Sequence, residues 1–153
     1  MSKLSPESLH ALLMAMQNEQ DTVQIYEHML RHVTNPQARE LLHRLIVEEH
    51  NHEQKIKERF FEGGGEMVEE SKIIGMDEKF PDRGQIFHVE LENCNVSELV
   101  NIAIESEQMN RDFYRSQEKR ARHNEVKEIF KWLAEQEEIH ISNLRNEYGS
   151  YLT

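Results

Sequence analysis

The sequence has few of the residues that interrupt or cross-link a chain. It contains one cysteine, three prolines and six glycines in 153 residues. The single Cys94 excludes an internal disulfide and any Cys-x-x-Cys iron or zinc module. Scarce proline and glycine favour long helices over an all-β or disordered chain. A chain of this length can bury its own core, so we expect a single domain spanning residues 1–153.

Long apolar runs and an excess of positive charge are also missing. No apolar stretch approaches the roughly 18 to 20 residues that span a bilayer, and residues 1–17 lack a basic start followed by an apolar run. We therefore expect a cytoplasmic protein with no membrane partner. Lysine and arginine number 18 against 29 acidic residues, giving a formal net charge of −11. This charge repels phosphate backbones, so nucleic acid is not an expected partner.

What the sequence does contain is four long helical stretches with recognisable starts. Ser5-Pro6 and Asn35-Pro36 place a capping side chain before a proline at the first helical position. Asn95-Val96-Ser97-Glu98 resembles a capping box, and Asn124 is a candidate cap before Glu125. Glycines follow the second and fourth stretches. The predicted helices run from Pro6 to Val33, Pro36 to Glu62, Val96 to Arg122 and Glu125 to Tyr148.

The connections between these helices predict the fold class. Tight turns make two antiparallel hairpins, and the segment from Gly63 to Asn95 is long enough to run the roughly 40 Å length of a helix. We therefore predict an all-α, ferritin-like four-helix bundle in which a long crossover joins the two hairpins. Apolar residues in the crossover predict that it packs on the bundle; these are Met67, Val68, Ile73, Ile74, Phe80, Ile86 and Phe87.

Each predicted core-facing stripe carries a carboxylate near the middle of its helix. Glu19 and Glu107 interrupt the apolar stripes of the first and third helices. The second and fourth helices each carry Glu-x-x-His, and this spacing lets both side chains of a pair reach one ion from one helix face. The two pairs are Glu49 with His52 and Glu137 with His140. One Glu from each of two helices plus Glu-x-x-His from each of the other two is the ligand pattern of di-iron carboxylate bundles.

An internal repeat relates the two hairpins. Adding 88 to the positions of Glu19, Tyr26, Glu49 and His52 gives Glu107, Tyr114, Glu137 and His140. Two similar hairpins packed about a pseudo-two-fold axis would bring both halves of this polar set together. Glu-x-x-His alone is a weak signal, because it also occurs at Glu7 and at Glu40, but only the other two examples lie in repeat register.

Burying four facing carboxylates without compensation is unfavourable by several kcal/mol or more. Two divalent cations would balance four ionised carboxylates, with neutral histidines completing the coordination. Carboxylate-rich sites with one imidazole per ion suit iron, with manganese or zinc as possible substitutes. The alternative is that the glutamates line a wet or partly protonated seam and that the histidines are ordinary core residues.

The motifs resemble those of the rubrerythrin branch of the ferritin-like superfamily over nearly the whole chain. They are Glu19 with Tyr26, Glu107 with Tyr114, and the runs at 45–52 and 133–140. The resemblance implies two iron ions, bridged by Glu49 and Glu137 and ligated from the ends by Glu19, Glu107, His52 and His140. It also implies that Tyr26 and Tyr114 hydrogen-bond ligand carboxylates, although both are compatible with ordinary core tyrosines.

Two departures from the family pattern shape the expected function. The sequence lacks the four cysteines of a rubredoxin-like module, so we expect an external electron donor. Asn110 stands where the family often has a further glutamate, which questions the usual peroxide route. We expect an oxidoreductase that handles peroxide or dioxygen, or a ferroxidase acting on Fe(II). The alternatives are a non-enzymatic iron-binding or iron-buffering protein and, less favoured, a metal-free interaction bundle.

Apolar residues off the main stripes indicate a homodimer, unless they lie beneath the crossover. These residues are Ile25, Met29, Ile102, Met109 and Phe113.

Overall fold

The computed structural model describes residues 3–66 and 90–152. Four long helices dominate: α1 (Pro6–His32), α2 (Pro36–Glu62), α4 (Val96–Arg120) and α5 (Asn124–Tyr148). Two short 3₁₀ turns, η2 (Leu91–Asn93) and η3 (Gly149–Tyr151), flank the second hairpin. The described residues contain no strand, so the predicted all-α class is confirmed. Within the described residues, no helix combines the length and apolar character needed to cross a membrane.

Local capping explains three of the four helix starts. The side chains of Ser5, Asn35 and Asn95 accept hydrogen bonds from the backbone N–H groups of Ser8, Ala38 and Glu98, respectively. Each cap satisfies a donor that the first helical turn leaves unpaired. The observed helix ends lie within two residues of the predicted ones.

The predicted cap at Asn124 is wrong. Asn124 is the first residue of α5, and the cap position belongs to His123, whose side chain makes no capping hydrogen bond. A contact distant in sequence holds this helix start instead. A carboxylate oxygen of Glu125 accepts a 2.9 Å hydrogen bond from the Ser5 backbone N–H and a 2.5 Å bond from the Ser8 hydroxyl.

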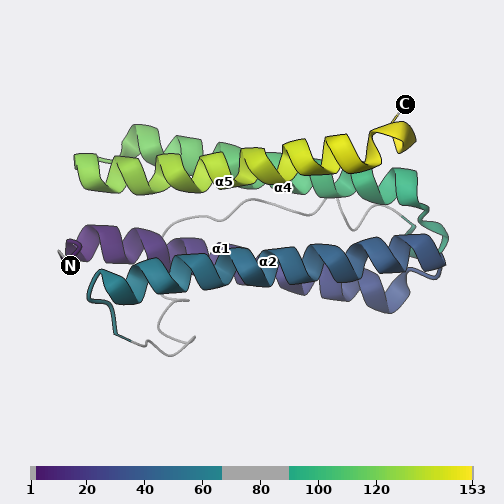
Figure 1. Cartoon of the computed structure of the whole chain (residues 1–153), viewed down its shortest axis with the longest axis horizontal. Helices are drawn as coiled ribbons and strands as arrows, with labels where there is room; N and C mark the ends of the chain where they lie inside the picture. Colours follow the sequence, from purple (N-terminus) through teal and green to yellow (C-terminus); the bar gives the residue numbers. More distant parts are fainter. Residues whose placement is uncertain (1–2, 67–89, 153) are drawn as a thin grey trace.

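The two antiparallel hairpins, α1 with α2 and α4 with α5, lie one against the other along their full length (Figure 1). The Leu4 N–H donates to the Gly63 carbonyl, so α2 ends beside the start of α1. At the opposite end, the Thr34 hydroxyl donates to the Glu92 carbonyl. Gly63 and Glu92, which flank the predicted crossover, therefore lie at opposite ends of the bundle. The seven apolar crossover residues, 67 to 87, lie outside the described residues.

The core consists of two apolar clusters, one centred on Leu42, Leu99 and Ile141 and the other on Leu12, Ile129 and Leu133. Met29 and Ile102, which suggested a dimer surface, are buried in the first cluster with exposed fractions of 0% and 7%. They lie on helix faces that the chain itself covers, so they do not support an interface. A set of buried polar residues at the middle of the four helices belongs to neither cluster.

Candidate metal centre

The four predicted glutamates meet at the centre of the bundle. Glu19 on α1, Glu49 on α2, Glu107 on α4 and Glu137 on α5 are each no more than 1% exposed. Carboxylates are almost never this deeply buried unless they are paired. Their convergence follows from the fold, since each occupies a core-facing position halfway along its helix.

The two histidines complete the cluster but differ in exposure. The side chain of His52 is 1% exposed, whereas that of His140 is 17% exposed. Their rings meet edge to face, with centroids 5.0 Å apart. One half of the centre is therefore sealed, and the other half reaches solvent beside His140.

Distances between potential donor atoms fall in the range of a metal cluster. His52 Nδ1 lies 3.3 Å from a Glu19 oxygen and 3.4 Å from a Glu137 oxygen. His140 Nδ1 lies 3.8 Å from a Glu49 oxygen and 3.7 Å from a Glu107 oxygen.

Three overlapping triads each have all their donor atoms within 4.8 Å of one another: Glu19–Glu49–His52, Glu49–Glu107–His140 and His52–Glu137–His140. Glu49 belongs to a triad in each half, which is the position that a bridging ligand requires.

The centre also contains polar atoms whose hydrogen-bonding capacity is unused. Within the described residues, seven buried side-chain oxygen and nitrogen atoms make no hydrogen bond, and all belong to Glu19, Glu49, His52, Glu107 and Glu137. Native proteins leave few such atoms, because each costs about 1 to 3 kcal/mol. Carboxylate oxygens and imidazole nitrogens are metal ligands. The donor set therefore fits divalent cations.

Without metal, the four carboxyl groups divide into two classes. Burial raises the pKa values of Glu49 and Glu137 well above the ordinary value, and the negative charges of Glu107 and Glu19 raise them further. Burial also opposes ionisation of Glu19, but the adjacent His52 outweighs it and lowers the Glu19 pKa.

The pKa of Glu107 is likewise lowered, to about 2, because Glu137 and His140 outweigh burial. In the absence of metal, Glu49 and Glu137 therefore keep their protons to a higher pH than Glu19 and Glu107 do.

The two predicted tyrosines are buried and link the halves reciprocally. The Tyr26 hydroxyl on α1 donates to a Glu107 oxygen on α4 at 3.3 Å. The Tyr114 hydroxyl on α4 donates to a Glu19 oxygen on α1 at 3.1 Å. Positions 88 residues apart therefore exchange equivalent hydrogen bonds across the pseudo-two-fold axis. Such contacts orient carboxylates that would ligate metal.

A buried amide network supports one of these tyrosines. The Asn18 side-chain amide donates to the Tyr114 hydroxyl at 3.0 Å and to the side-chain Oδ1 of Asn110 at 3.2 Å. Asn110 in turn donates to the Thr22 hydroxyl at 3.3 Å, and Thr22 donates to the Asn18 backbone carbonyl.

Asn110 thus lies in the seam between α1 and α4. Sequence patterns indicated Asn110 only as the absence of a glutamate and did not single out Asn18 or Thr22. The repeat offered a signal, because Thr22 and Asn110 are equivalent positions 88 residues apart.

Replacing Tyr114 with phenylalanine is expected to weaken metal binding in the half that contains Glu19 and His52. The change removes the donor to Glu19 and leaves a buried Asn18 amide hydrogen without its acceptor. Loss of such an orienting contact typically lowers metal affinity by about 10- to 100-fold. Stepwise calorimetric titration with Mn(II) measures the effect. Tyr26→Phe is the matched variant, and it should weaken metal binding in the half that contains Glu107 and His140. If both variants gave the same titration curve as the wild type, the tyrosines would not orient ligand carboxylates.

Comparison with known proteins agrees with the geometry over the second hairpin. Residues 98–152 match the model of the Rubrerythrin family. The resemblance to rubrerythrins, a ferritin-like di-iron family, is confirmed by this match. The matched segment contains Glu107, Glu137 and His140. Together with the glutamates and histidine of the first hairpin, they form a buried cluster that is compatible with a di-iron site.

A solved structure supports the fold over nearly the whole chain. It is described as a hypothetical protein, Pfu-1136390-001, from Pyrococcus furiosus. It superimposes with a TM-score of 0.55 at 22% sequence identity, covering 94% of this chain and 90% of its own. At this identity the likeness concerns the fold alone. None of the curated proteins searched matches the chain.

Proposed function

We propose that this chain is a di-iron carboxylate protein that reacts with peroxide or dioxygen, as a rubrerythrin-like oxidoreductase or a ferroxidase. The observation that carries this proposal is the convergence of four buried glutamates and two histidines, among which, in the described part of the chain, seven buried oxygen and nitrogen atoms make no hydrogen bond. The match of the second hairpin to the Rubrerythrin family supports it. Iron is the preferred metal for this donor set, and manganese or zinc are possible substitutes.

In this proposal the protein supplies a balanced and oriented ligand set. Glu49 and Glu137 would hold both ions, and Glu19 with His52 and Glu107 with His140 would each hold one. Four carboxylates balance two divalent charges, so the histidines bind as neutral imidazoles. Bound iron would supply electrons to the oxidant and take them back from an external donor.

The surroundings determine how reactants reach the centre. The apolar clusters on both sides exclude water along the bundle axis. The partial exposure of His140 offers small oxidants or Fe(II) an approach from one side. Tyr26 and Tyr114 hold the end carboxylates through their hydroxyl groups. We also propose that the protein is cytoplasmic and forms a homodimer.

The oxidant preference depends on Asn110. A neutral amide is a poor replacement for an anionic ligand, and this amide is already engaged by Asn18 and Thr22. We therefore expect Glu107, His52 and His140 to serve in both oxidation states, with slow peroxide turnover. Asn110→Glu should accelerate peroxide oxidation of the diferrous protein by about tenfold or more, a modest part of the range seen for positioned catalytic groups.

Stopped-flow absorbance with peroxide and with dioxygen, in wild type and Asn110→Glu, tests this expectation. Asn110→Asp is the matched control, because its shorter side chain adds the charge without the reach. If the wild type already reacts far faster with peroxide than with dioxygen, and Asn110→Glu changes neither rate, an ordinary peroxidase is the better assignment. Iron binding without accelerated oxidation by either oxidant would instead indicate an iron-buffering protein.

A further inference from the structure

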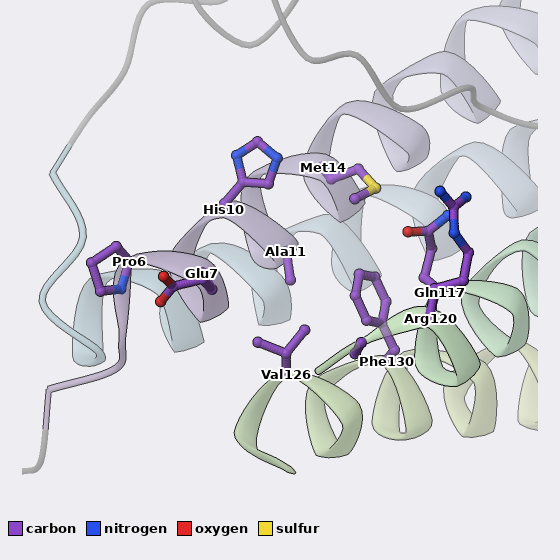
Figure 2. Close-up of a pocket in the computed structure, with 10 residues that line it drawn as sticks. Pro6, Glu7, His10, Ala11, Met14, Gln117, Arg120, Val126 and Phe130 are labelled. Carbon is purple, nitrogen blue, oxygen red and sulfur yellow. The ribbon is translucent and has the colours of Figure 1, made fainter. Parts of the chain in front are cut away.

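A cavity separate from the metal centre lies at the end of the bundle where α1 begins and α4 joins α5. Its volume is about 450 Å³, within the range of small-molecule sites. Figure 2 shows Ala11, Val126 and Phe130 between two polar ends, with Glu7 at one end and Gln117 and Arg120 at the other. None of the six predicted metal ligands lines it.

The floor of this cavity is apolar and formed by core residues. Ala11, Met14, Val126 and Phe130 all line it and are between 2% and 8% exposed. At its polar ends, Glu7 and Arg120 are exposed and Gln117 is half-buried. A concave apolar surface with a few polar groups at its edge is the usual form of a site for a small organic ligand.

The charge at one end of the cavity specifies the kind of ligand. Arg120 lies in the turn region 119–123, which holds four basic side chains, Lys119, Arg120, Arg122 and His123, in a chain of net charge −11. Within the described residues the Arg120 guanidinium forms no ion pair. Beside it, Gln117 adds amide hydrogens. Guanidinium and amide N–H groups together recognise carboxylate, sulfonate or phosphate oxygens.

We propose that this cavity binds a small organic anion with a flat, apolar body of one or two rings. The ring system lies over Ala11, Val126 and Phe130, and the anionic group faces Arg120 and Gln117. Glu7, at the far end, disfavours ligands with a second negative charge there. The aromatic ring of Phe130 stacks on Tyr114 with centroids 6.4 Å apart, and Tyr114 donates to Glu19. The cavity therefore lies one aromatic pair away from the metal centre.

The first test uses 8-anilinonaphthalene-1-sulfonate, an aromatic anion that fluoresces in apolar surroundings. The folded full-length protein should bind it at one saturable site per chain. Arg120→Glu should weaken binding by about fivefold to tenfold, because an attractive exposed charge becomes repulsive. Arg122→Glu is the matched control, since it makes the same charge change outside the lining, and should bind within about twofold of wild type. Ala121→Phe fills the cavity from its partly exposed edge and should abolish saturable binding.

Unchanged binding in Arg120→Glu and Ala121→Phe, or an equal loss in Arg122→Glu, would overturn the proposal. Methyl NMR on the wild-type protein provides a second measurement that needs no variant. The Met14 methyl resonance should shift on adding the dye, because Met14 lines the cavity, and that of Met29 in the other apolar cluster should not. A shift at Met29 without one at Met14 would place the dye elsewhere.

Discussion

Anaerobic titration of the apoprotein with Fe(II) is expected to saturate at about two ions per chain, the number that the complete ligand set holds. The Glu49→Ala, Glu137→Ala double variant should take up no iron under the same conditions. The two residues occupy the centre of the cluster, and Glu49 shares donor-atom triads with both histidines. His52→Ala should weaken mainly one of the two binding steps, because His52 lies in the sealed half with Glu19.

A nearby glutamate provides the matched control for this experiment. Glu53 follows His52 and is 7% exposed, but its Oε1 atom is engaged by both Gln20 and Lys57. Glu53→Gln should therefore still bind about two ions.

The double variant should also melt at a higher temperature than the wild-type apoprotein, since it removes two buried carboxyl groups, three of whose four oxygens make no hydrogen bond. A folded double variant that still binds two ions would remove Glu49 and Glu137 from the ligand set.

Metal is expected to stabilise the protein far more at pH 7.5 than at pH 5. The folded-state pKa values of Glu49 and Glu137 are raised. Their favourable contribution to the free energy of unfolding is therefore complete below the pKa of the unfolded chain, near 4.5, and declines as pH rises. Each retained proton costs the apoprotein about 1.4 kcal/mol per pH unit in this range.

Glu19 and Glu107 have lowered pKa values and act in the opposite sense. Their contribution is present above the unfolded value and is lost only in strong acid, so it does not vary between pH 5 and 7.5. The pKa of His140 is raised, because the hydrogen bond and charge of Glu107 outweigh burial. Its proton therefore competes with metal at pH 5.

Thermal melts with and without Mn(II) measure the difference. At a metal concentration about a thousandfold above Kd, the stabilisation is about 4 kcal/mol, or roughly 10 °C for a chain of this size. We expect this shift at pH 7.5 and less than half of it at pH 5. The Glu49→Gln, Glu137→Gln double variant, which keeps the side-chain size but carries no titratable group, should show neither the metal effect nor the decline of apoprotein stability. A wild-type metal effect as large at pH 5 as at pH 7.5 would contradict the raised pKa values of Glu49 and Glu137.

Much of the fold was readable from local signals. Ser5, Asn35 and Asn95 cap their own helices, so residues a few positions apart suffice to predict those starts. The start of α5 was misplaced by one residue because its anchoring contacts join Glu125 to Ser5 and Ser8, more than 110 residues away. Contacts across that separation leave no periodic signal in the sequence.

The candidate centre shows the same division. The mid-helix positions of Glu19, Glu49, Glu107 and Glu137 follow from helical periodicity, and the 88-residue repeat pairs them. Periodicity does not report which apolar faces the neighbouring helices cover. Met29 and Ile102, which periodicity places off the main stripes, are therefore in the chain's own core and not on a free surface. Periodicity likewise does not show that Asn110 contacts Asn18 and Thr22 on α1, so from the sequence Asn110 indicates only the absence of a glutamate ligand.

The sequence by itself determined the all-α class, the inward positions of six polar residues and the repeat that relates the two hairpins. Each of these depends on the spacing of residues along a helix. Only the tertiary structure decided how those residues differ from one another. Packing seals His52 and leaves His140 partly open, and it pairs each tyrosine with the glutamate of the opposite hairpin. Burial and cross-helix hydrogen bonds arise only when four helices meet, so equivalent residues in the repeat acquire unequal surroundings.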